Sequence, residues 1–259
     1  KKLKDAYAQK TGQDLGSALS GNFSGTESDI AKNLLAGDKA GASAARVKLA
    51  TEGFFFTDKD AIYKQMEGKK PEERQAMVDA YNKAYGKGPD GKNFDATLQD
   101  NLSGLDLTKA KQLEKDGKLD DAFALNYAMH GSWWSSDKEA MKSTLAGKSK
   151  AEIDALCTKY QKDYGIDLRK EITDSTSGRA GFEIGQMMKG EPSTPEERLA
   201  RANEAYDFER GSGSNAFSRG FMDLFSDKGK LLDAQHGRIQ ELADKAKAGK
   251  VKEKARPTA

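Results

Sequence analysis

Two stretches of this chain repeat one pattern without a gap. Residues 57–86 read TDKDAIYKQMEGKKPEERQAMVDAYNKAYG, and residues 136–165 read SDKEAMKSTLAGKSKAEIDALCTKYQKDYG. The offset between them is constant, since 136 − 57 and 165 − 86 both give 79. Identical pairs include Asp58/Asp137, Lys59/Lys138, Gly68/Gly147, Tyr81/Tyr160, Tyr85/Tyr164 and Gly86/Gly165. Self-similarity at a fixed period indicates a protein built by stacking one supersecondary unit.

The repeat continues toward both ends of the chain. YAQKTG at residues 7–12 resembles the tyrosine tracts that end at Gly86 and Gly165, and each tract is followed by a Ser-Gly close. We place these closes at glycines 21, 104 and 178, so the spacings from the tract glycine are 21 − 12 = 9, 104 − 86 = 18 and 178 − 165 = 13. The middle copy carries a Gly-Pro-Asp-Gly insertion at residues 88–91, which is a strong turn signal. Residues 199–225 resemble the start of a further copy.

These boundaries predict four parts. Residues 1–40 hold the C-terminal part of a first repeat, 41–118 a second repeat and 119–191 a third. Residues 192–259 hold the N-terminal part of a fourth repeat and a basic tail. The opening within a motif and the absence of an initiator Met suggest a fragment of a longer polypeptide with flanking repeats.

Residues that favour the starts and ends of helices recur within each unit. Apolar residues at helical spacing run from residue 44 to a stop at Gly53, and Thr57 is placed to cap the next helix with Asp60 in the capping-box position. Pro71 suits the first turn of a third helix, which the pattern extends to Tyr85. Two short helices follow, one ending near residue 103 and one over 108–115. The sequence predicts an all-α fold of tandem five-helix repeats.

Composition excludes several classes of protein. The 259 residues are 36% hydrophobic and 32% charged, and 43 Lys+Arg against 41 Asp+Glu leave a net charge of +2. No global field therefore recruits nucleic acid. Cys157 is the single cysteine, so no intramolecular disulfide framework holds the fold. No apolar stretch has the length of a membrane span, and we expect a soluble protein, cytoplasmic or peripheral to a membrane. We find no nucleophile–base pair and expect no enzyme.

Two tracts carry a resemblance to a known family. YQKDYGIDLRKEITDSTSG at residues 160–178 and GQDLGSALSGNF at residues 12–23 resemble the annexin repeat, with its Tyr/Phe helix end, Gly-x-Asp-Leu, charged helix and Leu-Ser/Thr-Gly close. The segments at 57–62 and 136–141 resemble that family's Gly-x-Gly-Thr-Asp-Glu start. The resemblance implies a curved array of five-helix repeats. It also implies binding to anionic phospholipid through calcium, held by loop carbonyls and one acidic side chain about forty residues on.

The implied calcium site is eroded in this sequence. The Gly-x-Gly-Thr loop is replaced by FFFT at residues 54–57 and by WWSS at 133–136. The acidic position falls on Asn101 in one repeat and on Ser175 in the next. The remaining candidate metal ligands are neighbouring acids and the glycines of a fourth loop, GSGS at 211–214: Gly211, Gly213, Asp100 and Asp174. Calcium is therefore expected to bind weakly or not at all.

Aromatic residues occupy the two altered loops. They are candidates for membrane contact, because aromatic rings suit the lipid headgroup boundary: Phe54, Phe55, Phe56, Trp133 and Trp134. The alternative is that some rings pack in the core or contact a protein. Two functions remain open. The first is an annexin-like module on acidic phospholipid membranes with calcium dependence weakened or lost. The second is a structural or protein-interaction repeat within a larger secreted or assembled protein.

Overall fold

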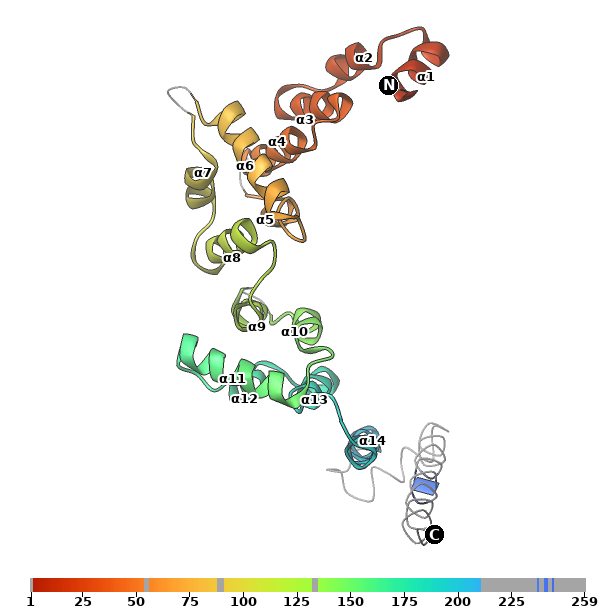
Figure 1. The fold of residues 1–259 in the computed structure, drawn as a ribbon, viewed down its shortest axis with the longest axis vertical. Coiled ribbons are helices and arrows are strands. Elements are labelled where there is room, and N and C mark those ends of the chain that lie inside the picture. Colours follow the sequence, from red (N-terminus) through yellow and green to blue (C-terminus); the bar gives the residue numbers. More distant parts are fainter. Residues whose placement is uncertain are drawn as a thin grey trace, which may run out of the picture. The chain divides into compact units, whose positions relative to one another are not determined.

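The computed structural model describes residues 2–53, 56–87, 91–131 and 135–210, together with four isolated positions between 237 and 244. In these residues every regular element is an α-helix and there is no strand, which confirms the predicted all-α class (Figure 1). None of the described helices is long and apolar enough to cross a bilayer.

The chain forms two compact units, residues 1–133 and residues 134–259. The first unit contains α1 (Lys2–Thr11), α2 (Leu15–Asn22), α3 (Gly25–Ala36), α4 (Lys39–Thr51), α5 (Lys59–Lys64), α6 (Pro71–Tyr85), α7 (Phe94–Asn101), α8 (Gly104–Asp116) and α9 (Asp121–His130). The second contains α10 (Lys138–Leu145), α11 (Lys150–Tyr164), α12 (Leu168–Ser175), α13 (Gly178–Met187) and α14 (Pro195–Arg210).

Helix lengths follow the sequence repeat. α4 to α8 and α9 to α13 are successive sets of five helices. The third helices of the two sets, α6 and α11, each have 15 residues, and the fourth helices, α7 and α12, each have 8. We propose that these sets are the second and third repeats.

The Ser-Gly close of the first copy lies four residues later than the sequence pattern suggested. α2 runs through Gly21 and ends at Asn22, so the turn into α3 is Phe23-Ser24-Gly25. Its glycine has a φ of +54°, against +55° at Gly104 and +60° at Gly178, a left-handed conformation that favours glycine. The spacing in the first copy becomes 25 − 12 = 13, equal to 178 − 165 = 13 in the third copy. The spacing of 9 residues that the sequence pattern predicted for the first copy was therefore wrong.

The predicted start of α6 is confirmed, and the predicted N-cap of α5 is wrong. Pro71 is the first residue of α6, and α6 ends at Tyr85, as predicted. Thr57 does not cap α5, because the N-cap is Asp58, whose carboxylate accepts a hydrogen bond from the Ala61 N–H at 2.9 Å. The carboxylate of Asp137 caps α10 in the same way through the Ala140 N–H. A short acidic side chain is a strong N-cap, and this leaves Thr57 available for another contact.

Each unit has an apolar core made by the repeated positions. Tyr81 on α6 and Tyr160 on α11 are 1% and 0% exposed, as the repeat requires of a packing residue. In the first unit, the Tyr81 ring packs edge-on against Phe94, and its hydroxyl donates to Thr97 Oγ1 at 3.0 Å. In the second unit, Tyr160 belongs to a buried set that also contains Met141, Leu145, Ile153, Leu168, Ile172 and Ile184.

The carboxyl ends of the two fifth helices are capped by guanidinium groups from different places. In the second repeat, Arg74 on α6 is 5% exposed and donates to the carbonyls of Glu114, Lys115 and Lys69. The matching position on α11 is Ile153, since 74 + 79 = 153, and it is fully buried. There Arg169 on α12 donates to the Met188 carbonyl at 2.5 Å instead. Both arrangements satisfy carbonyls that a helix end leaves without intrahelical partners.

A polar cluster joins α5, α8 and α9 in the first unit. Asp106 accepts hydrogen bonds from the hydroxyls of Tyr63 and Tyr127 and pairs with Lys59 at 2.7 Å. Lys109 lies over both tyrosine rings, 4.4 and 4.3 Å from their centroids. Burial would raise the pKa of Asp106, but the bonds from Lys59 and the tyrosines outweigh it and lower that pKa. The cluster attaches α9 to the helices before it.

Candidate functional site

The loop between α4 and α5 contacts the end of α7. The Asp58 N–H donates to the Ala50 carbonyl at 2.9 Å, which closes the loop at its base. The Thr57 hydroxyl then donates to Asn101 Oδ1 at 3.3 Å. The other end of the Asn101 amide donates to the Thr97 carbonyl at 2.9 Å, which sets the orientation of the side chain. Asn101 is the residue on which the implied acidic position falls.

The third repeat makes the corresponding contact. Ser136, one period after Thr57, donates its hydroxyl to the carbonyl of Ser175 at 2.8 Å. Ser175 is the last residue of α12, as Asn101 is the last residue of α7. We call the contacts Thr57–Asn101 and Ser136–Ser175 the loop latches. In both repeats the loop and the helix end meet where the resemblance implies a calcium site, and a neutral group stands where that site needs a carboxylate.

The neighbouring acids form ion pairs away from the latches. Asp100 pairs with Lys92 at 2.5 Å, and Asp174 pairs with Lys170 at 2.5 Å. These hydrogen bonds raise the pKa of both lysines. Asp58 and Asp137 are engaged as N-caps. No carboxylate hydrogen-bonded to a loop latch is present in the described part of the chain.

At the two latches, the residues present therefore lack the one carboxylate that the implied calcium site needs. Calcium takes six to eight oxygen ligands, usually with several carboxylates among them. Over the residues that the structure describes, no three His, Cys, Asp or Glu side chains gather as a metal site would require. The candidates Gly211 and Gly213 lie outside the described residues.

One candidate aromatic residue is described, and it is exposed. The Phe56 side chain is 87% exposed. It borders a groove of about 570 Å³ between α4 and α5, lined also by Arg46, Leu49, Ala50, Gly53, Asp58, Asp60, Ala61, Lys64 and Gln65. Phe54, Phe55, Trp133 and Trp134 lie outside the described residues, so their membrane contact stays a prediction.

Sequence reasoning missed the loop hydroxyls and the cations of this groove. Thr57 was interpreted as a helix cap, although its separation from Asn101, 101 − 57 = 44, is close to the spacing that the family's site implies. Arg46 lies within a helix and has no motif around it. Its half-exposed guanidinium makes no ion pair or hydrogen bond with any residue of the described ranges.

The fold and the latches define a class of protein: an all-α protein of five-helix repeats, in which the first loop of a repeat is held to the end of its fourth helix. Comparison with known proteins identifies the class further. A sequence model of the annexin family, described as Annexin, matches residues 120–181. Annexin A5 of Gallus gallus is 26% identical over 139 residues, which are 54% of this chain and 41% of that protein.

A second annexin and one solved structure are also similar to parts of this chain. Annexin A13 of Mus musculus is 27% identical over 161 residues, covering 61% of this chain and 48% of that protein. The solved structure of chicken annexin V has 20% sequence identity and a TM-score of 0.32, and the match covers 78% of this chain and 61% of that one. The chain is thus similar to the annexin family model over residues 120–181 and to these annexins over about half of its length. It spans less than half the length of the two relatives named here.

Proposed function

We propose that this chain is a non-enzymatic annexin-like module that associates with acidic phospholipid membranes, with calcium dependence weakened or lost in its second and third repeats. The observation that carries the proposal is the pair of loop latches. Thr57 and Ser136, which follow the two altered loops, are bonded to Asn101 and Ser175, the residues on which the implied acidic positions fall.

The latches connect the residues just before α5 and α10 to the ends of α7 and α12 without an ion. A bound cation would hold the loop carbonyls and the acidic side chain together. Here hydrogen bonds of 3.3 and 2.8 Å connect the same two places. Each such bond contributes about 0.5–1.5 kcal/mol. In this proposal, protein groups alone make the connection, and calcium is not needed as the bridge.

Direct contacts supply the membrane affinity in this proposal. Burying the exposed Phe56 ring in the headgroup boundary contributes roughly 1.5–3 kcal/mol if burial is complete. Arg46 and Lys64 border the same groove, and a basic side chain near an anionic leaflet contributes about 1 kcal/mol. The sum of these contacts is enough for reversible association and is sensitive to salt.

The composition of the same groove favours one alternative. Asp58 and Asp60 line it beside Arg46 and Lys64, and mixed charge around an exposed aromatic ring also suits a protein surface. A structural or protein-interaction module, within a longer chain of flanking repeats, is therefore the second candidate.

Co-sedimentation distinguishes the two. The protein is mixed with phosphatidylserine vesicles in calcium and in chelator, with phosphatidylcholine vesicles as the control. We expect equal sedimentation with phosphatidylserine in calcium and chelator, and little with phosphatidylcholine. Absence of vesicle binding under both conditions would favour the protein-interaction module. Binding only in calcium would show that the latches do not replace the ion.

A further inference from the structure

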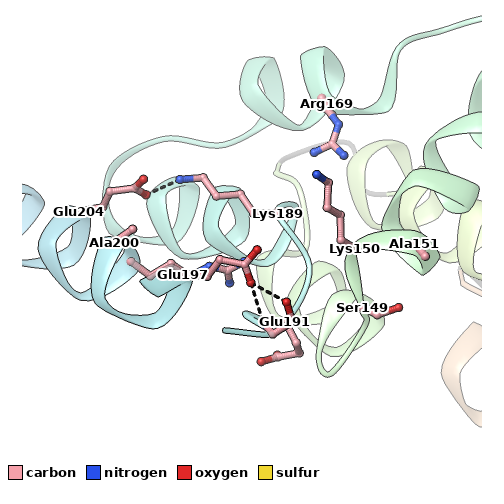
Figure 2. Close-up of a pocket in the computed structure, with 11 residues that line it drawn as sticks. Ser149, Lys150, Ala151, Arg169, Lys189, Glu191, Glu197, Ala200 and Glu204 are labelled. Atoms are coloured by element: carbon pink, nitrogen blue, oxygen red, sulfur yellow. Dashed lines mark hydrogen bonds and ion pairs between the residues drawn. The ribbon is translucent and has the colours of Figure 1, made fainter. Parts of the chain in front are cut away.

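A second concave site lies in the second unit, apart from the loop latches. It is a pocket of about 550 Å³ among the start of α11, the first turn of α12, the segment after α13, and α14 (Figure 2). It is lined by Ser149, Lys150, Ala151, Arg169, Lys189, Glu191, Ser193, Glu197, Ala200, Arg201 and Glu204. None of these residues forms a latch. Arg169 and Ser175 are six residues apart on α12, a separation of about 9 Å along the helix.

Most charges in the pocket are used within the protein. Glu197 accepts hydrogen bonds from the backbone and hydroxyl of Ser193, at 2.6 and 2.9 Å, and from the Thr194 N–H. These bonds lower its pKa and commit it to the start of α14. Glu204 pairs with Lys189 and accepts from Gln186 at 2.7 Å. These carboxylates are therefore already supplied with donors and oppose a bound anion less than free ones would.

Two cationic side chains, those of Lys150 and Arg169, lie side by side in the pocket. Lys150 makes no hydrogen bond or ion pair with other residues of the described ranges. The Arg169 guanidinium uses Nη1 for the Met188 carbonyl and Nη2 for Asp154 at 2.8 Å. Figure 2 shows the Lys150 ammonium and the Arg169 guanidinium directed toward each other across the same space. Asp154 compensates part of the Arg169 charge, and an anion between the two cations would compensate the charge of Lys150 as well.

The backbone holds these groups in place. The carbonyl of Gly190 accepts a hydrogen bond from Arg201, and the Glu191 N–H donates to the Lys148 carbonyl at 2.7 Å. A Cβ at Gly190 would collide with the backbone of Lys150, so the segment after α13 lies directly against the start of α11. The pocket is thus formed by fixed backbone contacts and does not depend on surface side chains alone.

We propose that this pocket binds a small phosphate-bearing anion between Lys150 and Arg169. A guanidinium has five N–H donors, so Arg169 keeps three for phosphate oxygens beside its bonds to Met188 and Asp154, and Lys150 adds a point charge. The Glu191 carboxylate also lines the pocket and is exposed, so it weakens the site by repulsion. This inference is independent of the proposed membrane function.

Isothermal titration calorimetry of the whole chain with inorganic pyrophosphate tests the proposal. We expect saturable binding that Lys150→Gln weakens about tenfold, the effect of losing one charge-assisted contact. Glu191→Gln should strengthen the same binding. Lys138→Gln, on α10 and absent from the pocket lining, is the matched control and should change nothing.

Three results would overturn the proposal. The first is that the native chain shows no saturable binding of pyrophosphate. The second is that Lys150→Gln and Lys138→Gln lose the same amount of pyrophosphate affinity. The third is that the native chain binds acetate as tightly as pyrophosphate. Phosphatidic acid vesicles in a parallel experiment distinguish the source of the phosphate. Sedimentation that depends on Lys150 indicates a lipid headgroup, and pyrophosphate binding without it indicates a soluble phosphate. Because the exposed Lys150 side chain makes no hydrogen bond or ion pair with other described residues, its substitution should change stability little.

Discussion

The hydroxyl of Thr57 donates to the amide oxygen of Asn101 across 44 residues of sequence, at 3.3 Å. This bond links the first loop of a repeat to the end of its fourth helix, and Ser136 and Ser175 are linked in the next repeat. Both latches use uncharged groups. A calcium site at the same place would use a carboxylate, so the latches are the structural basis on which calcium dependence can be tested.

The first prediction concerns calcium. We expect calorimetry of the native chain to show weak or no calcium binding at the loops around residues 55 and 134. Asn101→Asp should increase calcium affinity, because it restores an anionic oxygen ligand at the helix end. Asn22→Asp is the matched control, since Asn22 also ends an eight-residue helix, and its side chain bonds only to the Ala18 carbonyl among the described residues. Micromolar affinity in the native chain that is lost on changing Asp100 or Asp174 would contradict this prediction.

The second prediction concerns the exposed aromatic side chains. Phe56→Ser should reduce sedimentation with phosphatidylserine vesicles, because the ring is available for burial at the headgroup boundary. The free energy of unfolding should change by no more than about 0.5 kcal/mol, since the side chain is 87% exposed. Leu34→Ser, at a position that is 51% exposed on α3, is the control.

The double variant Trp133→Ser/Trp134→Ser is tested by the same two measurements, vesicle sedimentation and stability. If these rings contact the membrane, vesicle binding falls and the melting temperature stays nearly constant. A loss of several kcal/mol of stability would place the two rings in the core.

The third prediction concerns the guanidinium caps. Arg74→Met should lower the free energy of unfolding by about 2–4 kcal/mol, because it removes three part-buried hydrogen bonds of the Arg74 guanidinium. Arg198→Met removes one exposed contact of 3.4 Å and should have an effect below about 0.5 kcal/mol. Urea unfolding of both variants measures the difference. Equal effects would show that the Arg74 bonds contribute little.

The fourth prediction concerns pH. Burial, followed by the hydrogen bond to Asp106, raises the pKa of Tyr127 to about 12. An unfolded tyrosine titrates near pH 10. The folded state therefore keeps a proton that the unfolded state loses, and stability falls as the pH rises from about 10 to about 12. Asp106→Asn should lower the pKa of Tyr127 while leaving it above 10, because burial persists. Ultraviolet titration of tyrosinate checks this, with Tyr127→Phe identifying the signal.

Much of the fold could be predicted from the sequence because helix signals are local. Pro71 begins α6 and Tyr81 and Tyr160 are buried, as residue type and period predicted. The first Ser-Gly close could not be placed, since both Leu19-Ser20-Gly21 and Phe23-Ser24-Gly25 satisfy the pattern of residue types. The length of α2 decides between them. Because α2 continues to Asn22 and Gly25 has a φ of +54°, the close is Phe23-Ser24-Gly25.

The candidate site was harder to predict because its bonds connect distant residues. Asn101 was placed at the acidic position, but its partner was interpreted as a helix cap, since threonine and aspartate are both good caps and stand next to each other. Arg74 lies among charged residues on α6 and resembles an exposed position in the sequence. Its burial follows from the carbonyls of α8, which only the folded chain brings near.

The different origins of the guanidinium caps limit how the repeats can be recombined. Transplanting α11 in place of α6 would put isoleucine at the Arg74 position, and the carbonyls of Glu114 and Lys115 would lose their donor. The reverse exchange would bury a second guanidinium in a repeat where Arg169 already serves the Met188 carbonyl. Two helices of identical length and matching period have thus become specific to their own neighbours. A chimera that respects the 79-residue period would be less stable than the native chain unless α12 or α8 moved with its partner.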